Sequence, residues 1–265
     1  MSEEKKIPDP PVKICFERII PDNLDQERMA RRSLREYISN NIGGTLDASA
    51  TYRVARMAIN ITKRWPKGSV IKCHFLDGSN MMRERVVVKA KEWEKYANIK
   101  FEFVNAVTAE IRISFFADAG SWSALGKDAL NTYYFPLHQP TMNLGWLRDN
   151  TDDDEYSRVV MHEFGHCLAC LHEHSGPRFS RKWNVDAVMK YFQGPPNYWT
   201  PEEIEYNVLK KYSPEGIIDT PYDPLSIMLY DFDASLFADG FGPTNSNIIL
   251  SELDKSLVGE MYPRT

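Results

Sequence analysis

Residues 162–174 read HEFGHCLACLHEH and hold four of the six histidines of this 265-residue chain. His162 and His166 are four residues apart, so on a helix they share one face. Two imidazoles placed in this way can both reach one zinc ion at about 2.0–2.1 Å. Glu163 follows the first of them and can take a proton from a metal-bound water. The stretch therefore predicts a helical metal site with its own general base, against the alternative of core histidines at a chance spacing.

The residues before this stretch predict where the helix begins. Residues 152–155 are all acidic, and negative charge is favoured at a helix N-terminus. The apolar residues Tyr156, Val159 and Val160 then lead into the histidines. We expect a buried helix that starts near residue 152.

His172 limits the length of that helix. On a continuous helix it would lie about 120° around the axis from His166 and one and a half turns further on. From there it could not join the same tetrahedral site, so the helix is expected to end near Cys170 and the chain to turn back. If the turn needs a positive φ, the alanine at position 169 costs about 1 kcal/mol.

At this point the segment resembles the metzincin zinc peptidases, in which a glycine turn and a third histidine follow the helix. Glu173, directly after the third histidine, is the mark of the astacin branch. Ala169 stands at the usual glycine position. The resemblance implies that His162, His166 and His172 hold one Zn²⁺. It also implies that Glu163 is the catalytic base and that Glu173 is a structural anchor near the base of the cleft.

A second stretch, Ser226-Ile-Met-Leu-Tyr230, resembles the Met-turn of the same clan. The resemblance implies that Met228 forms an apolar floor under the histidines. It leaves two roles for Tyr230: a displaceable fifth ligand, or a hydrogen-bond donor to the oxyanion. Taken alone, both residues would be read as ordinary core residues.

Residues from about 53 to 263 resemble the astacin-like peptidases of bacteria and fungi, whereas the first fifty residues match no known pattern. The resemblance implies an α+β metzincin fold: a twisted mixed sheet with the active-site helix, and a loop-rich lower subdomain with the Met-turn. We expect three parts: an N-terminal extension or pro-segment (1–50), an upper catalytic subdomain (51–174) and a lower one (175–265).

Residue periodicity predicts the individual elements. Strands are expected at 70–76, 99–103, 111–115 and 141–146, with a short one in VKICFERII (12–20). Helices are expected at 23–39, 50–65, 81–97, 186–192, 201–212 and 251–261, the last with Ser251 as its N-cap. The strand before the zinc helix would be an edge strand, and the resemblance implies that Met142, Asn143 and Leu144 pair with extended substrate.

Composition limits the partners. The chain is 43% hydrophobic and 26% charged, as in ordinary globular proteins, with a net charge of −5. This gives no reason to expect nucleic acid or an anionic membrane, and no apolar run is long enough to span a bilayer. We expect a monomer that acts on a peptide or protein. MSEEKKIPDPP lacks the apolar core of a signal peptide, which predicts a cytoplasmic protein or export by a signal-independent route.

The chain has four cysteines. Cys167 and Cys170 form a CxxC pair in the zinc helix, but their apolar neighbours favour buried core thiols over redox or metal chemistry. Cys15 lies in the N-terminal segment. Its thiolate could occupy the open zinc position, as in cysteine-switch zymogens, although no switch motif surrounds it.

Two functions follow as hypotheses. The first is a zinc-dependent endopeptidase, in which the three histidines leave one metal position open for water. The second is a catalytically weak or latent zinc-binding module that holds a peptide in the same pocket. Ala169 is the only residue that favours an inactive module, and the intact Glu163 argues against it; Cys15 is the residue that would make the enzyme latent.

Overall fold

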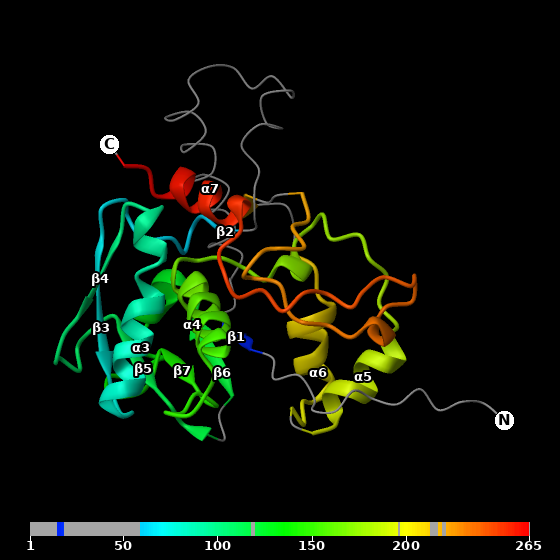
Figure 1. Ribbon diagram of the computed structural model, residues 1–265, viewed down its shortest axis with the longest axis horizontal. Coiled ribbons are helices and arrows are strands. Elements are labelled where there is room, and N and C mark those ends of the chain that lie inside the picture. Colours follow the sequence, from blue (N-terminus) through cyan, green and yellow to red (C-terminus); the bar gives the residue numbers. More distant parts are fainter. Residues whose placement is uncertain are drawn as a thin grey trace, which may run out of the picture.

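One half of the molecule is built on a six-stranded sheet, whose strand order is β1-β6-β7-β5-β3-β4 (Figure 1). The computed structural model describes residues 15–18, 59–117, 120–195, 197–212, 217–218 and 221–264. β6 and β7 pair antiparallel and all other neighbours pair parallel, so the sheet is mixed, as predicted. The strands are β1 (Phe16–Arg18), β3 (Val70–Phe75), β4 (Lys100–Phe103), β5 (Ile111–Ser114), β6 (Ser121–Ala124) and β7 (Met142–Leu144). A separate antiparallel pair joins β2 (Ile59–Asn60) to β8 (Ile217–Ile218).

Burial along the strands follows their position in the sheet. β3 buries Ile71 and Cys73 and exposes Val70 and Lys72, the alternation of a strand with one covered face. Every residue of β5, β6 and β7 is buried, because these central strands are covered on both sides.

Two helices pack against each other beside the sheet, α3 (Asn80–Ala90) and the zinc helix α4 (Asp153–Cys167). α3 buries Met82, Val86 and Ala90, which are four residues apart and so share one face. The helix is shorter than the predicted 81–97. After Ala90 the chain tightens into a 3₁₀ turn, η1 (Trp93–Lys95), and the buried Trp93 indole donates to the carbonyl of Met161, 2.9 Å away.

β7 is not an edge strand, and this prediction was wrong. β7 lies between β5 and β6 and uses the hydrogen-bonding edges of its backbone on both of them. Residues Met142, Asn143 and Leu144 therefore cannot add a substrate strand. The strand outside β7 is β6, which the periodicity did not predict; its four residues, SWSA, are too few to show a clear period, and all of them are buried.

The helix predicted at 50–65 is also wrong where the structure describes it. Residues 50–58, like the predicted helix at 23–39, lie outside the described residues. Ile59 and Asn60 form β2 and the chain then turns. The Asn60 side chain accepts hydrogen bonds from the backbone N–H and the hydroxyl of Thr62, a local turn that competes with a helix.

The second half of the molecule holds α5 (Val185–Gln193), α6 (Pro201–Ile204) and a π-helical turn η5 (Glu205–Leu209) (Figure 1). Its own core includes Phe179, Val188 and Phe232. The last helix, α7 (Glu252–Met261), has Ser251 as its N-cap, as predicted, but packs into the core of the first half. The division at residues 174/175 stays a prediction, with α7 lying across it.

None of the described helices is both long and apolar enough to cross a lipid bilayer.

Candidate active site

The zinc helix begins where the sequence indicates. Asp152 is the N-cap, and its side chain accepts a hydrogen bond of 2.9 Å from the backbone N–H of Asp154. The acidic residues that follow lie in the first turn, where the helix dipole favours them. His162, Glu163 and His166 are all buried in the last part of the helix.

The helix ends at Cys167, and the chain then reverses its direction at Ala169. Ala169 has φ of 68°, the left-handed conformation that usually requires glycine. Its N–H bonds the carbonyl of His166 at 2.8 Å, and the N–H of Cys170 bonds that of Gly165 at 3.0 Å. These bonds satisfy the last carbonyls of the helix. The turn therefore does place Ala169 at a positive φ, and the reversal returns His172 to the histidines of the helix.

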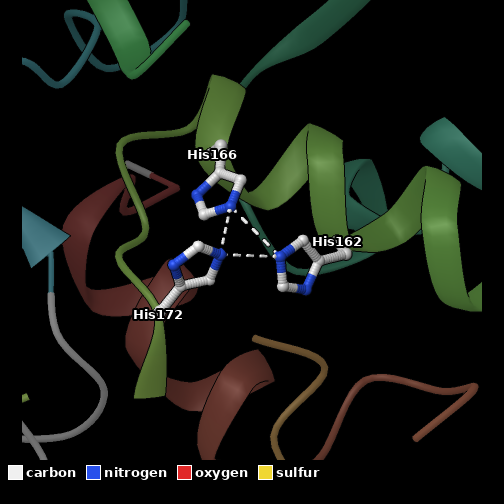
Figure 2. Close-up of side chains that lie close together, drawn as sticks. All are labelled: His162, His166 and His172. Atoms are coloured by element: carbon white, nitrogen blue, oxygen red, sulfur yellow. Dashed lines mark hydrogen bonds between the residues drawn. The ribbon is translucent and has the colours of Figure 1, made fainter. Parts of the chain in front are cut away.

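The three histidines meet at one point (Figure 2). Each pair of Nε2 atoms among His162, His166 and His172 is separated by 3.1 Å. All three side chains are at most 3% exposed. Burial lowers the pKa of His166 to about 4 and also lowers the pKa of His162 and His172, so the rings are neutral at pH 7.

Backbone carbonyls fix which nitrogen carries the proton in two of the three rings, those of His162 and His166. Nδ1 of His162 lies 2.8 Å from the carbonyl of Ile227, and Nδ1 of His166 lies 2.8 Å from that of Cys170. A carbonyl only accepts, so both protons must be on Nδ1 and both Nε2 lone pairs face the centre. Nδ1 of His172 lies 3.3 Å from the hydroxyl of Tyr230. Converging lone pairs repel unless a cation lies between them.

The geometry fits zinc. The three nitrogens form a near-equilateral triangle, and an ion roughly 1 Å above its plane would be about 2.1 Å from each, the usual zinc–imidazole distance. The three histidines, all buried, form a group able to hold a metal ion. Three protein ligands on one side of the ion are the pattern of a catalytic zinc site with an open position.

The Met-turn closes the site from the second half of the chain. Met228 is fully buried, and its sulfur would collide with a Cβ placed on Gly165. Only glycine at this helix position leaves room for the thioether. The adjacent Ile227 supplies the carbonyl that orients His162.

Asp254 of α7 holds the Met-turn in place. Its carboxylate accepts hydrogen bonds of 2.8 Å from the hydroxyl of Ser226 and from the backbone N–H of Ile227. The sequence analysis missed this residue. The available signal was its position three residues after the N-cap Ser251, where it completes a capping box.

Glu173 lies on the other side of the Met-turn. Its side chain accepts a 2.8 Å hydrogen bond from the backbone N–H of Asp223, and its own N–H donates to the carbonyl of Met228 at 3.0 Å. These contacts agree with the expected anchoring. The fourth histidine of the stretch, His174, is not part of the three-histidine group. Its Nε2 lies 3.0 Å from the carbonyl of Asn207.

Cys15 and Tyr230 meet beside the histidines. The Tyr230 hydroxyl donates a short hydrogen bond to the backbone carbonyl of Cys15. The thiol of Cys15, a nitrogen of His162 and a carboxylate oxygen of Glu163 all lie within 4.8 Å of one another. Cys15 is 1% exposed. The N-terminal segment thus reaches the candidate site.

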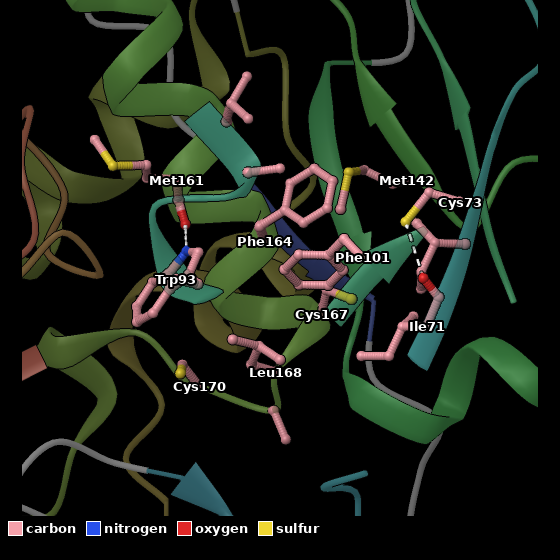
Figure 3. Close-up of a cluster of buried hydrophobic side chains, with 14 of the residues drawn as sticks. Ile71, Cys73, Trp93, Phe101, Met142, Met161, Phe164, Cys167, Leu168 and Cys170 are labelled. Atoms are coloured by element: carbon pink, nitrogen blue, oxygen red, sulfur yellow. Dashed lines mark hydrogen bonds between the residues drawn. The ribbon is translucent and has the colours of Figure 1, made fainter. Parts of the chain in front are cut away.

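The other three cysteines are core residues. Cys73, Cys167 and Cys170 are free and fully buried (Figure 3). Burial raises the pKa of all three thiols, so they stay protonated at neutral pH. The CxxC pair therefore packs as small apolar side chains, as predicted.

Comparison with known proteins agrees with this site. Residues 57–245 match the model of the astacin peptidase family. A structure of myroilysin shares 40% sequence identity and a TM-score of 0.74, covering 78% of this chain and 99% of that one. A second myroilysin structure shares 35% identity with a TM-score of 0.60, covering 83% and 98%. No curated protein matches the sequence.

A more distant structure supports the fold alone. The hatching enzyme zinc-protease HCE-1 from Oryzias latipes (Medaka fish) shares 21% identity and a TM-score of 0.51, covering 78% of this chain and 98% of that one.

Fold and histidine site together define a zinc metalloendopeptidase of the metzincin type. Within that class the chain belongs to the astacin family, and the expected α+β metzincin fold is confirmed. The proteases of this family act on peptides or proteins.

Ala169→Gly is expected to change the free energy of unfolding by less than about 1 kcal/mol. The relief of left-handed strain, about 1 kcal/mol, is offset by loss of a buried methyl worth about 0.8 kcal/mol. Ala169→Val should destabilise by more than about 2 kcal/mol, because a β-branched residue is strained at this φ and the turn is crowded. Urea denaturation of the three proteins measures both values. A valine variant as stable as the parent would show that the turn does not constrain this residue.

Proposed function

We propose that His162, His166 and His172 bind the catalytic zinc ion and that Glu163 is the general base of peptide hydrolysis. The observation that carries this proposal is the convergence of three buried Nε2 atoms with 3.1 Å between each pair. When bound, zinc acidifies a water molecule and polarises the scissile carbonyl.

Glu163 is positioned for the proton transfers. It follows His162 directly on α4 and is fully buried, and one of its carboxylate oxygens lies within 4.8 Å of a ring nitrogen of His162. The carboxylate takes the proton of the attacking water and then delivers it to the leaving amine. A low-dielectric surrounding strengthens this interaction with the developing charges.

Tyr230 is proposed to donate its hydroxyl hydrogen to the oxyanion, rather than to act as a fifth ligand. In this structure the hydroxyl already donates to a peptide carbonyl, that of Cys15, beside the same histidines. A substrate carbonyl in that position would receive the same hydrogen bond. Met228 and Glu173 are proposed to hold the site in place, as its apolar floor and as an anchor of the third-histidine loop.

The substrate is proposed to lie along β6 rather than β7. β6 is the strand next to the zinc helix on the outer side of β7, and an extended segment of this chain, β1, already pairs with it. Backbone hydrogen bonds to an available strand edge are a common way to bind extended peptides.

A latent form of this enzyme is the second candidate, and Cys15 is the residue that favours it. With β1 on β6 and its thiol near His162 and Glu163, the N-terminal segment occupies both the proposed substrate edge and the proposed open metal position. We propose that Cys15 is a latency switch whose thiolate binds the zinc ion until residues 1–50 are removed or displaced.

Glu163→Gln should retain about one zinc ion per chain and the parent's melting temperature, and lose several orders of magnitude in kcat, because it removes the base with little change in volume. Metal analysis and peptide turnover on one preparation measure this. Glu252→Gln, on the surface of α7 with its side chain 89% exposed, is the matched control and should be unaffected. Activity within tenfold of the parent would remove Glu163 from the role of base.

Tyr230→Phe should lower kcat by roughly 10–1000-fold without loss of zinc, because it deletes one donor to the oxyanion and leaves the ring in place. A lower melting temperature with an unchanged kcat would show instead that Tyr230 only packs. Steady-state kinetics and thermal unfolding separate the two outcomes.

Cys15→Ala in the full chain should raise peptidase activity, because the metal position is no longer occupied by sulfur. In the cobalt-substituted protein the sulfur-to-cobalt charge-transfer absorption of the parent should disappear in this variant. Cys73→Ala, which removes a core thiol, should keep that absorption. A parent spectrum without the sulfur band would exclude Cys15 as a ligand.

A further inference from the structure

The connection between β6 and β7 carries an unusual exposed surface. Residues 129–147 contain no Asp, Glu, Lys or Arg, although these make up 26% of the chain. Within this stretch Tyr133 is 85% exposed and Tyr134 52%, with Leu130 at 51% and Leu137 at 48%. These four side chains are here called the aromatic platform. Scattered apolar residues are normal on a surface, but here four of eight consecutive residues expose a large apolar side chain, and the rings of Tyr133 and Tyr134 lie 5.2 Å apart between centroids.

Hydrogen bonds from buried and neighbouring side chains fix the backbone of the loop that carries the platform. The buried Arg112 donates to the carbonyl of Gln139 at 2.7 Å and to that of Phe135 at 2.9 Å. Asn131 accepts from the backbone N–H groups of Tyr133 and Tyr134 at 3.0 and 3.3 Å. A surface fixed before binding loses little conformational entropy when a partner docks.

The same loop is attached to the proposed substrate edge. The ring of Phe135 stacks against Trp122 of β6, with 6.4 Å between ring centroids. The N–H of Ala124, the last residue of β6, bonds the carbonyl of Thr141 at 2.7 Å, which closes the base of the loop.

β1 shows where an extended chain on this edge leads. Its register pairs Phe16 with Trp122 and Arg18 with Ala124. A chain that continues in this direction passes the end of β6, where the connection with the platform begins. A peptide lying along β6 in either orientation has one of its ends here.

We propose that the aromatic platform is a substrate-binding exosite. It binds an extended, uncharged segment of a protein substrate, rich in proline and apolar residues, that continues from the cleft past Ala124. Tyrosine rings offer flat apolar faces to proline and aliphatic side chains, and none of the four platform side chains carries a charge that would have to be desolvated. This proposal rests on the proposed substrate path along β6 and adds a substrate class to it.

The test uses the full zinc-loaded chain and three sets of peptides with the same cleavable core. The first set is the core alone. The second carries a twelve-residue Pro/Leu/Tyr-rich extension, and the third a twelve-residue Ser/Gly-rich extension. Each extension is placed at the N-terminal end in one peptide and at the C-terminal end in another. The parent should cleave one Pro/Leu/Tyr-rich peptide with a kcat/KM about 5–20-fold above its Ser/Gly-rich counterpart. Tyr133→Ser/Tyr134→Ser should abolish that advantage and leave cleavage of the core unchanged.

Met81→Ser/Val88→Ser is the matched control, since these side chains are 55% and 60% exposed and belong to α3 rather than to the loop. It should retain the advantage. Because both extended peptides are cleaved by one preparation, partial latency lowers both kcat/KM values equally and leaves their ratio unchanged. Fluorescence anisotropy with the labelled Pro/Leu/Tyr-rich extension gives an independent reading that needs no turnover, and the tyrosine double variant should bind it more weakly than the parent.

The two proposals fail in different ways. Absence of core cleavage both in the parent and in Cys15→Ala, with Glu163 intact, contradicts the proposed function, whereas the binding measurement still decides the exosite. Equal binding and an equal kcat/KM ratio in parent and tyrosine variant would overturn the exosite.

Discussion

Three imidazole Nε2 atoms lie 3.1 Å from one another inside the protein, and the surrounding structure depends on that constraint. Left without a cation, this arrangement combines desolvated nitrogens with mutual repulsion. The backbone enforces it, because the carbonyls of Ile227 and Cys170 each require a proton on Nδ1 and so turn Nε2 inward. Groups outside the three histidines thus orient the side chains that are proposed to bind the metal.

The enforcing groups come from distant parts of the chain. The carbonyl of Ile227 is held by Asp254 through the adjacent N–H, so the C-terminal helix positions a ligand on α4. The same helix packs into the core of the first half. Asp254 is buried in this position, and burial raises its pKa to about 6. Two hydrogen bonds to the Met-turn offset part of that cost.

The N-terminal segment lies at two proposed features, the latency switch and the substrate edge. β1 occupies the outer edge of β6, and Cys15 lies beside His162 and Glu163. One short segment thus covers the edge proposed for substrate and the metal position proposed for water. Coverage of both features by one segment is the basis of the proposed latency.

Several features follow from the sequence by itself. The i, i+4 histidines, the acidic N-cap region and the need to turn before His172 depend on helix geometry, which is local, and the structure has the helix and the turn as expected. Strands such as β3 were also predictable. Only one face of such a strand is covered, so apolar and polar residues alternate along its sequence.

Only the tertiary structure decided the rest. β6 has only four residues, all of them buried, and its place outside β7 and the exclusion of Met142–Leu144 from substrate pairing depend on strand order. The contacts of Asp254 with the Met-turn and of Cys15 with the histidine site join residues 27 and about 150 positions apart. Nothing local encodes such pairings, because they arise only when the packed core brings those segments together.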